Sequence, residues 1–543
     1  MNSTMVITVV GIVAIAAVGI SGRRAPSTEL GEWTVGKRRF STFTTWFLQA
    51  GESFTTFSFL GLAGIAFGGG VAASFALCYL AINFVLQYFT APRMRELGVR
   101  GGYLTQADFF VDRYRSPLLG KVVAVVGAVF LLPYLQLQIT GLGMIVQLAT
   151  GSRTGGNWSM VLATVLTVGF VLWSGIRGIA RVAYLKDALM IVGLVVLVVG
   201  VAVSVDGGIG GVFESVRDAH PQLLTLDQPG YDATFFVTAV IISGLGGGLG
   251  TMAHLWPPVL AAGSGRTLRS NAIWLPLYQL ALGIPIVVGF AGVLLVSKDA
   301  APNSVALTLA GQTLPGWLVG LVAVAAASAA MVPSAAIVVG ISSLLSRNLF
   351  SARDPRSQLR TNHLCVVAAA GLALALGLTR PGLLSDLLLL TYGGLTQLAP
   401  AIVMGLARRV RLGALPALLG IVAGVAVLAW LTFGGVDVGT VDTGLIALGV
   451  NLAVTAVAHL TVGDRGTAAH IASGTASRTE SGTESRRSAR TESGTVSSTE
   501  LRTESGPSSS TASRPSSAQM PSTEATVNGS SGVPSPSGPP LSN

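Results

Sequence analysis

The chain has 543 residues, of which 51% are hydrophobic and only 11% are charged, and its mean hydropathy is +0.66. A soluble domain carries about a quarter charged residues, so this composition excludes an ordinary water-soluble protein. The net charge of +10 does not indicate nucleic acid binding, because the positive side chains flank hydrophobic segments.

Thirteen apolar segments are near the length that crosses a bilayer, since a hydrocarbon core of about 30 Å needs about 20 apolar residues in a helix. The expected spans are 5–22, 43–68, 71–91, 119–149, 158–176, 182–205, 233–262, 271–297, 316–345, 362–379, 383–407, 413–434 and 443–463. We therefore expect an all-α polytopic protein of the cell membrane, in contact with the lipid bilayer and with no nucleic acid partner.

Positive charge alternates between the gaps that separate these segments. Twenty-three Lys and Arg lie in or beside every second gap, and the other gaps hold four. Arg23 and Arg24 follow the first apolar segment and no positive charge precedes it, which indicates an uncleaved helix rather than a signal peptide. The positive-inside rule then predicts an external N-terminus and a cytoplasmic C-terminus.

The last 80 residues, 464–543, have a different composition from the rest of the chain. They are rich in Ser, Thr, Gly, Pro, Glu and Arg, and the pentapeptide Arg-Thr-Glu-Ser-Gly recurs from Arg478, Arg490 and Arg502. Such a segment has too few large apolar side chains to form a core, so it is expected to be a disordered cytoplasmic tail.

Two of the expected spans contain helix-weakening residues deep in the bilayer. Segment 43–68 contains Ala50-Gly51-Glu52-Ser53, and segment 233–262 contains a glycine run over 243–250, followed by His254 and two prolines. Irregular backbone survives at this depth only where protein buries it or where it lines a wet cavity. The two segments are five spans apart and so run in opposite directions, which indicates an inverted-repeat transporter with a substrate site near the midplane.

Five stretches carry a further resemblance. They are LGEWTVGKRRFSTFTTWFLQAGESFTTFSFLGLAGIAF (Leu30–Phe67), YLTQADFFVDRYRSPLLG (Tyr103–Gly120), SGIRGIARVAYLKD (Ser174–Asp187), RTLRSNAIWLPLYQLAL (Arg266–Leu282) and TYGGLTQLAPAIVMGL (Thr391–Leu406). Together they resemble the sodium:solute symporter family over roughly residues 28–460. The bacterial monocarboxylate permeases are the most similar branch, through the Ala-Gly-Glu at 50–52 and the Val-Pro at 332–333.

The resemblance implies a five-plus-five inverted repeat of the leucine-transporter type. Residues 1–27 would supply an extra helix and the start of the first loop, 28–407 the transporter core, 408–463 two accessory helices and 464–543 the tail. The two repeats would be 43–205 and 233–407. The implied function is uptake of a small organic solute, such as a short monocarboxylate, an amino acid or a vitamin, coupled to Na⁺ or H⁺. A gradient-independent channel or facilitator is the alternative, and a sensor with the tail as its output is a third class.

The resemblance also places a candidate cation site. Gly51, Phe54 and Ala329 fall on positions where the family uses backbone carbonyls. The paired hydroxyl positions fall on Val332 and Pro333, which offer no hard oxygen ligand. A shifted alignment would bring Ser328 or Ser334 into the site.

Glu52 is the most consequential single residue, because a carboxylate inside the membrane is costly and therefore buried, paired, protonated or functional. We hypothesise that it carries the coupling proton, and the alternative is that it only accepts bonds from the unwound backbone. Candidate substrate contacts are Ser53, Thr55, Gln136, Ser243, Gly246, His254 and Gln397. Lys186 is interpreted as a snorkelling lysine at the membrane interface. No motif indicates catalysis, a fixed metal or a cofactor.

Overall fold

The protein is described here from a computed structural model, which defines residues 3–21, 29–150, 153–351, 354–380, 382 and 384–461. The expected tail, 464–543, lies outside the described residues.

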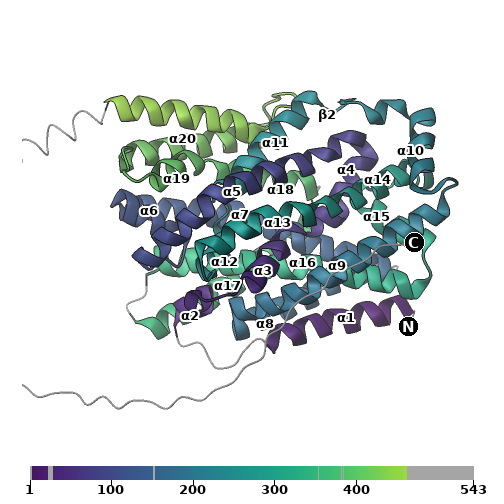
Figure 1. Ribbon diagram of the computed structural model, residues 1–543, viewed down its shortest axis with the longest axis horizontal. Coiled ribbons are helices and arrows are strands. Elements are labelled where there is room, and N and C mark those ends of the chain that lie inside the picture. The colour runs from purple at the N-terminus through teal and green to yellow at the C-terminus, as the bar shows by residue number, and fades with distance from the viewer. Residues whose placement is uncertain are drawn as a thin grey trace, which may run out of the picture. The chain divides into compact units, whose positions relative to one another are not determined.

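Long helices lying side by side form nearly all of the described chain (Figure 1). The α-helices are α1 (Ser3–Ile20), α2 (Leu30–Val35), α3 (Thr42–Ser53), α4 (Leu62–Gly69), α5 (Phe75–Gly101), α6 (Gln106–Tyr114), α7 (Pro117–Thr150), α8 (Arg153–Ser174), α9 (Ile176–Ser204), α10 (Gly208–Ala219), α11 (Ala233–Gly248), α12 (Trp256–Ala261), α13 (Gly265–Gln279), α14 (Gly283–Leu295), α15 (Val305–Thr313), α16 (Gly316–Leu344), α17 (Pro355–Thr379), α18 (Leu384–Thr396), α19 (Ala399–Leu406), α20 (Ala414–Phe433) and a last helix over Thr443–Thr461. The shorter elements are η1 (Gly36–Arg38), η2 (Phe57–Gly61), η3 (Gly70–Ser74), η4 (Pro221–Leu224), η5 (Ala253–Leu255), η6 (Leu280–Leu282), η7 (Pro302–Ser304) and η8 (Leu345–Leu349), and a hairpin of β1 (Asp227–Gln228) with β2 (Tyr231–Asp232).

Eleven helical stretches in the described chain are long and apolar enough to cross a membrane, and twelve if the bent pair α18–α19 is one span. The sequence predicted thirteen. Phe57–Gly101 counts as one stretch of 45 residues by this criterion, although it joins the expected spans 43–68 and 71–91. Gly70 interrupts it between α4 and α5 with a φ of 59°, a conformation that glycine adopts without strain.

Helix α16 forms the centre of the bundle. Its most apolar window is fully buried, and it packs against α1, α7, α9 and α17. Alanine, glycine and serine line much of this helix, and such small residues let neighbouring helices approach closely in a membrane, where lipid supplies no hydrophobic drive for association.

Both predicted helix breaks are confirmed. Helix α3 ends at Ser53, Phe54 is extended (φ −96°, ψ 104°), and the chain resumes as the π-helical turn η2 before α4. Helix α11 ends at Gly248, Gly250 has a φ of 79°, and the chain resumes through η5 into α12.

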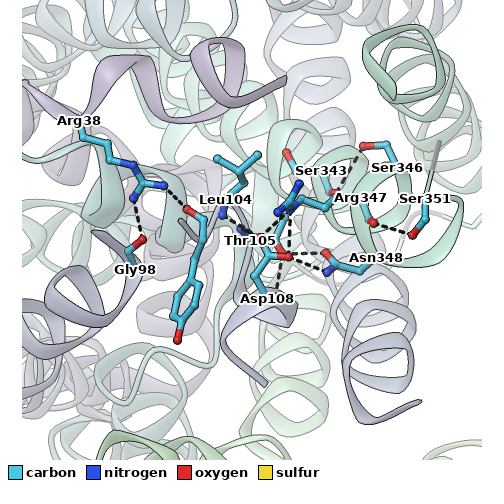
Figure 2. A network of polar contacts seen from close by, with 11 residues as sticks. Arg38, Gly98, Leu104, Thr105, Asp108, Ser343, Ser346, Arg347, Asn348 and Ser351 are labelled. Atoms are coloured by element: carbon cyan, nitrogen blue, oxygen red, sulfur yellow. Dashed lines mark hydrogen bonds and ion pairs between the residues drawn. The ribbon is translucent and has the colours of Figure 1, made fainter. Parts of the chain in front are cut away.

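A network of polar contacts ties the connection between α5 and α6 to the end of α16 (Figure 2). Arg347 in η8 donates from Nε to both carboxylate oxygens of Asp108, at 3.0 and 2.8 Å, and Asn348 donates to the same carboxylate at 2.9 Å. Asp108 also accepts hydrogen bonds from the backbone N–H groups of Leu104 and Thr105, and these bonds cap the start of α6.

Candidate functional site: a cavity between the two broken helices

One cavity touches both helix breaks. The cavity has a volume of about 60 Å³, which is room for several waters or a solute of a few heavy atoms. The first break contributes Glu52, Ser53 and Thr55 to its lining. The second break contributes Gly247, Gly248, Gly250, Met252 and His254. Four of the predicted site residues, Glu52, Ser53, Thr55 and His254, therefore share one cavity.

Helix α5 supplies a polar face that the sequence analysis missed. Tyr79, Asn83 and Gln87 line the cavity, and Gln87 Nε2 donates to Asn83 Oδ1 at 2.6 Å. These residues are spaced by four, which places them on one face of a helix. A polar stripe at that spacing in an apolar segment was the signal that could have identified them. Tyr134 of α7 and Tyr392 of α18 add further aromatic side chains to the lining.

An acid and a base face each other across the two breaks. His254 Nε2 lies 3.6 Å from Glu52 Oε2, and each side chain is only 2% exposed. Within the described chain, the two carboxylate oxygens of Glu52 have no hydrogen-bond partner, and His254 Nδ1 has none either. Buried polar atoms without partners are rare in proteins, so these atoms can hold a proton, a cation or a polar solute.

The free amides of the first break are satisfied by neighbouring side chains. Thr56 N–H donates to Gln138 Oε1 at 3.1 Å, and Thr55 N–H donates to Ser58 Oγ at 3.3 Å. Gln138 is fully buried on α7, so this long-range contact replaces part of the interrupted helix ladder.

The free carbonyls of the second break are satisfied in the same way. Gln106 Nε2 donates to Gly250 O at 2.9 Å and to Thr251 O at 2.7 Å, and Trp256 Nε1 donates to Gly250 O at 2.7 Å. No role for Gln106 was predicted from the sequence. No local pattern around it could have done so, because its partners lie more than 140 residues away in the chain.

The structure corrects the interpretation of Lys186 as a snorkelling lysine. Its side chain is 0% exposed, and its Nζ donates to Gly51 O at 3.0 Å and to Asp187 Oδ1 at 2.9 Å. A snorkelling lysine keeps its ammonium in water. Here the ammonium lies instead against the break in α3, over the Phe54 ring at 5.8 Å from its centroid.

The other predicted site residues do not line the cavity in the part of the chain that the structure describes. Gln136 Nε2 donates to Arg380 O at 2.7 Å, and Gln397 Nε2 donates to Gly444 O at 3.1 Å, so both link helices to neighbouring segments. Ser243 is fully buried, and Gly246 accepts a bond from Thr251 through its carbonyl.

The candidate cation ligands of α16 are also separated from the cavity. Ser334 Oγ donates to Ala330 O of its own helix at 2.7 Å and lines a second, smaller cavity with Thr164 and Thr167. Ala329 is fully buried within α16. Gly51 itself faces Ala183 and Val332, whose side-chain carbons would lie 3.3 and 3.4 Å from a Cβ placed on Gly51.

Comparison with known sequences places this architecture among transport proteins. The profile described as the sodium:solute symporter family matches residues 33–424. An uncharacterized symporter, YhjB, from Bacillus subtilis is 31% identical over 84% of this chain and 96% of its own length. A monocarboxylate transport permease protein from Rhizobium johnstonii is 29% identical over 84% of this chain and 94% of its own length.

Solved structures show a similar fold at low sequence identity. A Na⁺-coupled sialic acid symporter in a substrate-bound, outward-open state has a TM-score of 0.71 at 15% identity, covering 84% of this chain and 98% of that chain. MHP1, a nucleobase-cation-symport-1 family transporter, has a TM-score of 0.52 at 16% identity, covering 80% of this chain and 96% of that chain.

Proposed function

Because the chain belongs to the sodium:solute symporter family, whose profile covers residues 33–424, we propose that it is a secondary active symporter that imports a small organic solute by alternating access. It is a multi-pass membrane protein of a transporter family and not an enzyme. The observation that carries the proposal is the cavity lined by both interrupted helices, with Glu52 and His254 within ion-pair distance across it.

The proposed solute is a short monocarboxylate. The similarity to a monocarboxylate transport permease protein supports this class, and so does the size of the cavity. Hydroxyl and amide groups of Tyr79, Asn83 and Gln87 offer hydrogen-bond donors to a carboxylate. An amino acid or a vitamin is the alternative solute.

The proposed topology is the one expected from the sequence. It has thirteen spans, an external N-terminus, a cytoplasmic C-terminus, and repeats over 43–205 and 233–407. The two helix breaks at matching positions of these repeats support it, as does the fold shared with the solved symporters. Residues 1–27 would add one helix, 408–463 two accessory helices, and 464–543 a disordered cytoplasmic tail.

The proposed coupling ion is Na⁺ or H⁺, bound beside the break in α3, with Glu52 as the proposed carrier if the ion is a proton. Gly51, Phe54, Ala329 and Ser334 remain the candidate sodium ligands from the family resemblance. The proposed solute contacts are Ser53, Thr55 and His254 at the cavity, with Gln136, Ser243, Gly246 and Gln397 as further candidates in another state of the transport cycle.

Uptake by the purified protein in liposomes tests this function. Sodium and pH gradients would be imposed separately, with acetate, pyruvate, lactate and a neutral solute as candidates. Accumulation of one solute against its own gradient, driven by one of the two ions, is the expected result. Solute flux that only equilibrates and ignores both gradients would identify a channel or facilitator instead.

A further inference from the structure

The carbonyl group of Gly51 already has a cationic partner in this protein. The Lys186 ammonium donates to it at 3.0 Å, from a side chain on α9 that is 0% exposed. The same carbonyl is a candidate ligand for the coupling cation. A metal ion coordinated by the oxygen would need the space that Nζ fills, and it would also be repelled by the positive charge of the lysine.

The lysine is held in this position by a second contact. Asp187 Oδ1 accepts from Nζ at 2.9 Å, and the same oxygen accepts the Tyr278 hydroxyl of α13 at 3.0 Å. Asp187 is 3% exposed, so the pair is shielded from water. An ion pair at this depth is stable only when its geometry and its additional hydrogen bonds compensate for desolvation.

The α16 side of the position offers no oxygen from a side chain. Val332 is the α16 residue beside Gly51, and its neighbour at the other expected hydroxyl position is Pro333. The hydroxyls of Ser328 and Ser334 bond to Ala325 O and Ala330 O within α16. A hard cation prefers several oxygen ligands and a space to occupy between them. The described residues around Gly51 do not provide both, because the Lys186 ammonium fills the space beside the Gly51 carbonyl.

We propose that the Lys186 ammonium is a built-in cation at the sodium position between α3 and α9, so that no sodium ion binds there and transport does not require sodium. The tethered charge stabilises the broken end of α3 through Gly51 and fixes it to α9, which is the structural task that a bound ion would otherwise perform. The transport part of this inference rests on the proposed function, whereas the binding part does not.

Sodium binding is tested without any transport assay. The melting temperature of the purified full-length protein would be measured in sodium chloride and in choline chloride at equal ionic strength and pH. The wild-type melting temperature is expected to be the same in both salts, because a ligand stabilises a protein only if it binds the folded state. A higher wild-type melting temperature in sodium, together with binding of radioactive sodium, would overturn the proposal.

Removing the lysine supplies the second arm. Lys186→Ala leaves the Gly51 carbonyl and the Asp187 carboxylate facing the vacated space, so this variant is expected to gain stabilisation by sodium over choline. Lys121→Ala, which removes an exposed lysine of α7, is the matched control and should show no salt preference. A folded Lys186→Ala variant that is indifferent to sodium would show that the missing side-chain oxygens, and not the lysine, exclude the ion, and this would overturn the role proposed for Lys186. If Lys186→Ala folds in neither salt, Lys186→Gln takes its place, and the wild-type measurement stands on its own.

Uptake in liposomes supplies the third arm. Wild-type accumulation driven by a pH gradient is expected to be unchanged when choline replaces sodium on both sides. Accumulation that stops without sodium would overturn this inference and leave the proposed symport intact. Absence of uptake under every gradient would contradict the proposed function, and the melting measurements would still decide the sodium position.

Discussion

The imidazole Nε2 of His254 lies 3.6 Å from the carboxylate Oε2 of Glu52, although the two residues are some 200 positions apart in the chain. Glu52 lies just before the break that follows α3, and His254 lies just after the break that follows α11. Both side chains line the same cavity. A change of charge on either side chain therefore acts directly on the contact between the two broken helices.

Glu52→Gln should remove the response of uptake to an imposed pH gradient, since the amide cannot bind and release a proton. We expect the pH-driven stimulation to fall by about tenfold or more, a size typical of coupling between two sites. Glu214→Gln, at an exposed position of α10, is the control. Persisting pH-driven stimulation in Glu52→Gln would exclude the proton role.

Gln106→Ala should destabilise the second helix break, because it leaves the buried Thr251 carbonyl without its side-chain donor, while the Gly250 carbonyl keeps the bond from Trp256 Nε1. The expected loss is about 1–3 kcal/mol of unfolding free energy for the one unsatisfied carbonyl, measured by thermal or denaturant unfolding in detergent. Gln312→Ala, at an exposed position of α15, should change stability by much less. Equal effects of the two variants would contradict the structural role of Gln106.

Asp108→Ala should cost more stability than Arg347→Ala, although each removes the same ion pair. Asp108 also accepts from Asn348 and from two backbone amides, which would lose their partner, whereas Arg347→Ala leaves those bonds in place (Figure 2). We expect a loss of about 3 kcal/mol for Asp108→Ala and about 1 kcal/mol for Arg347→Ala. Asp218→Ala, at an exposed pair with Arg217, should have no measurable effect. A smaller effect of Asp108→Ala than of Arg347→Ala would contradict this reading of the network.

Gly289→Ala should destabilise the contact between α14 and α4. An added Cβ would lie 2.3 Å from the Ala63 carbonyl oxygen and 2.5 Å from the Ala66 Cβ, and backbone atoms cannot move aside cheaply. The expected cost is about 1–3 kcal/mol, read from the melting temperature. Gly283→Ala in the same helix meets no atom within 4 Å and should be close to neutral. Tolerance of Gly289→Ala at the level of Gly283→Ala would show that the two helices are not in close contact.

Asp442, which lies just before the last helix, should make the free energy of unfolding depend on pH. Burial raises the pKa of Asp442 from its ordinary value of 3.8 to about 6, although backbone N–H groups of Gly444 and Leu445 oppose this shift. The folded protein then binds more protons than the unfolded chain between those values, so stability falls as the pH rises through this window.

Asp442→Asn removes this proton-linked loss and keeps an oxygen that can accept from Gly444 N–H. The variant should therefore melt higher than the wild type above about pH 6, and the difference should shrink towards about pH 4. A constant difference in melting temperature over that range would contradict the raised pKa.

The sequence alone determined the class of the molecule and the two points where its helices break. Both properties are local, because the length of an apolar segment indicates a span, and Gly and Pro at 51, 246–248, 250 and 257–258 weaken a helix wherever it packs. For the same reason Glu52 and His254 could be named as candidate site residues before any contact between them was known.

Only the tertiary structure decided which side chains meet at those breaks. Lys186 reaches Gly51 across 135 residues and Gln106 reaches Gly250 across 144, and no periodicity in the sequence encodes such pairs. The sequence predicted thirteen spans and divided the chain between 68 and 71, where Gly70 turns it, whereas the described residues form eleven or twelve long apolar stretches because Phe57–Gly101 counts as one. Burial of Lys186 depends on how α9 packs against α3 and α13, and that packing is a property of the assembled bundle rather than of any one segment.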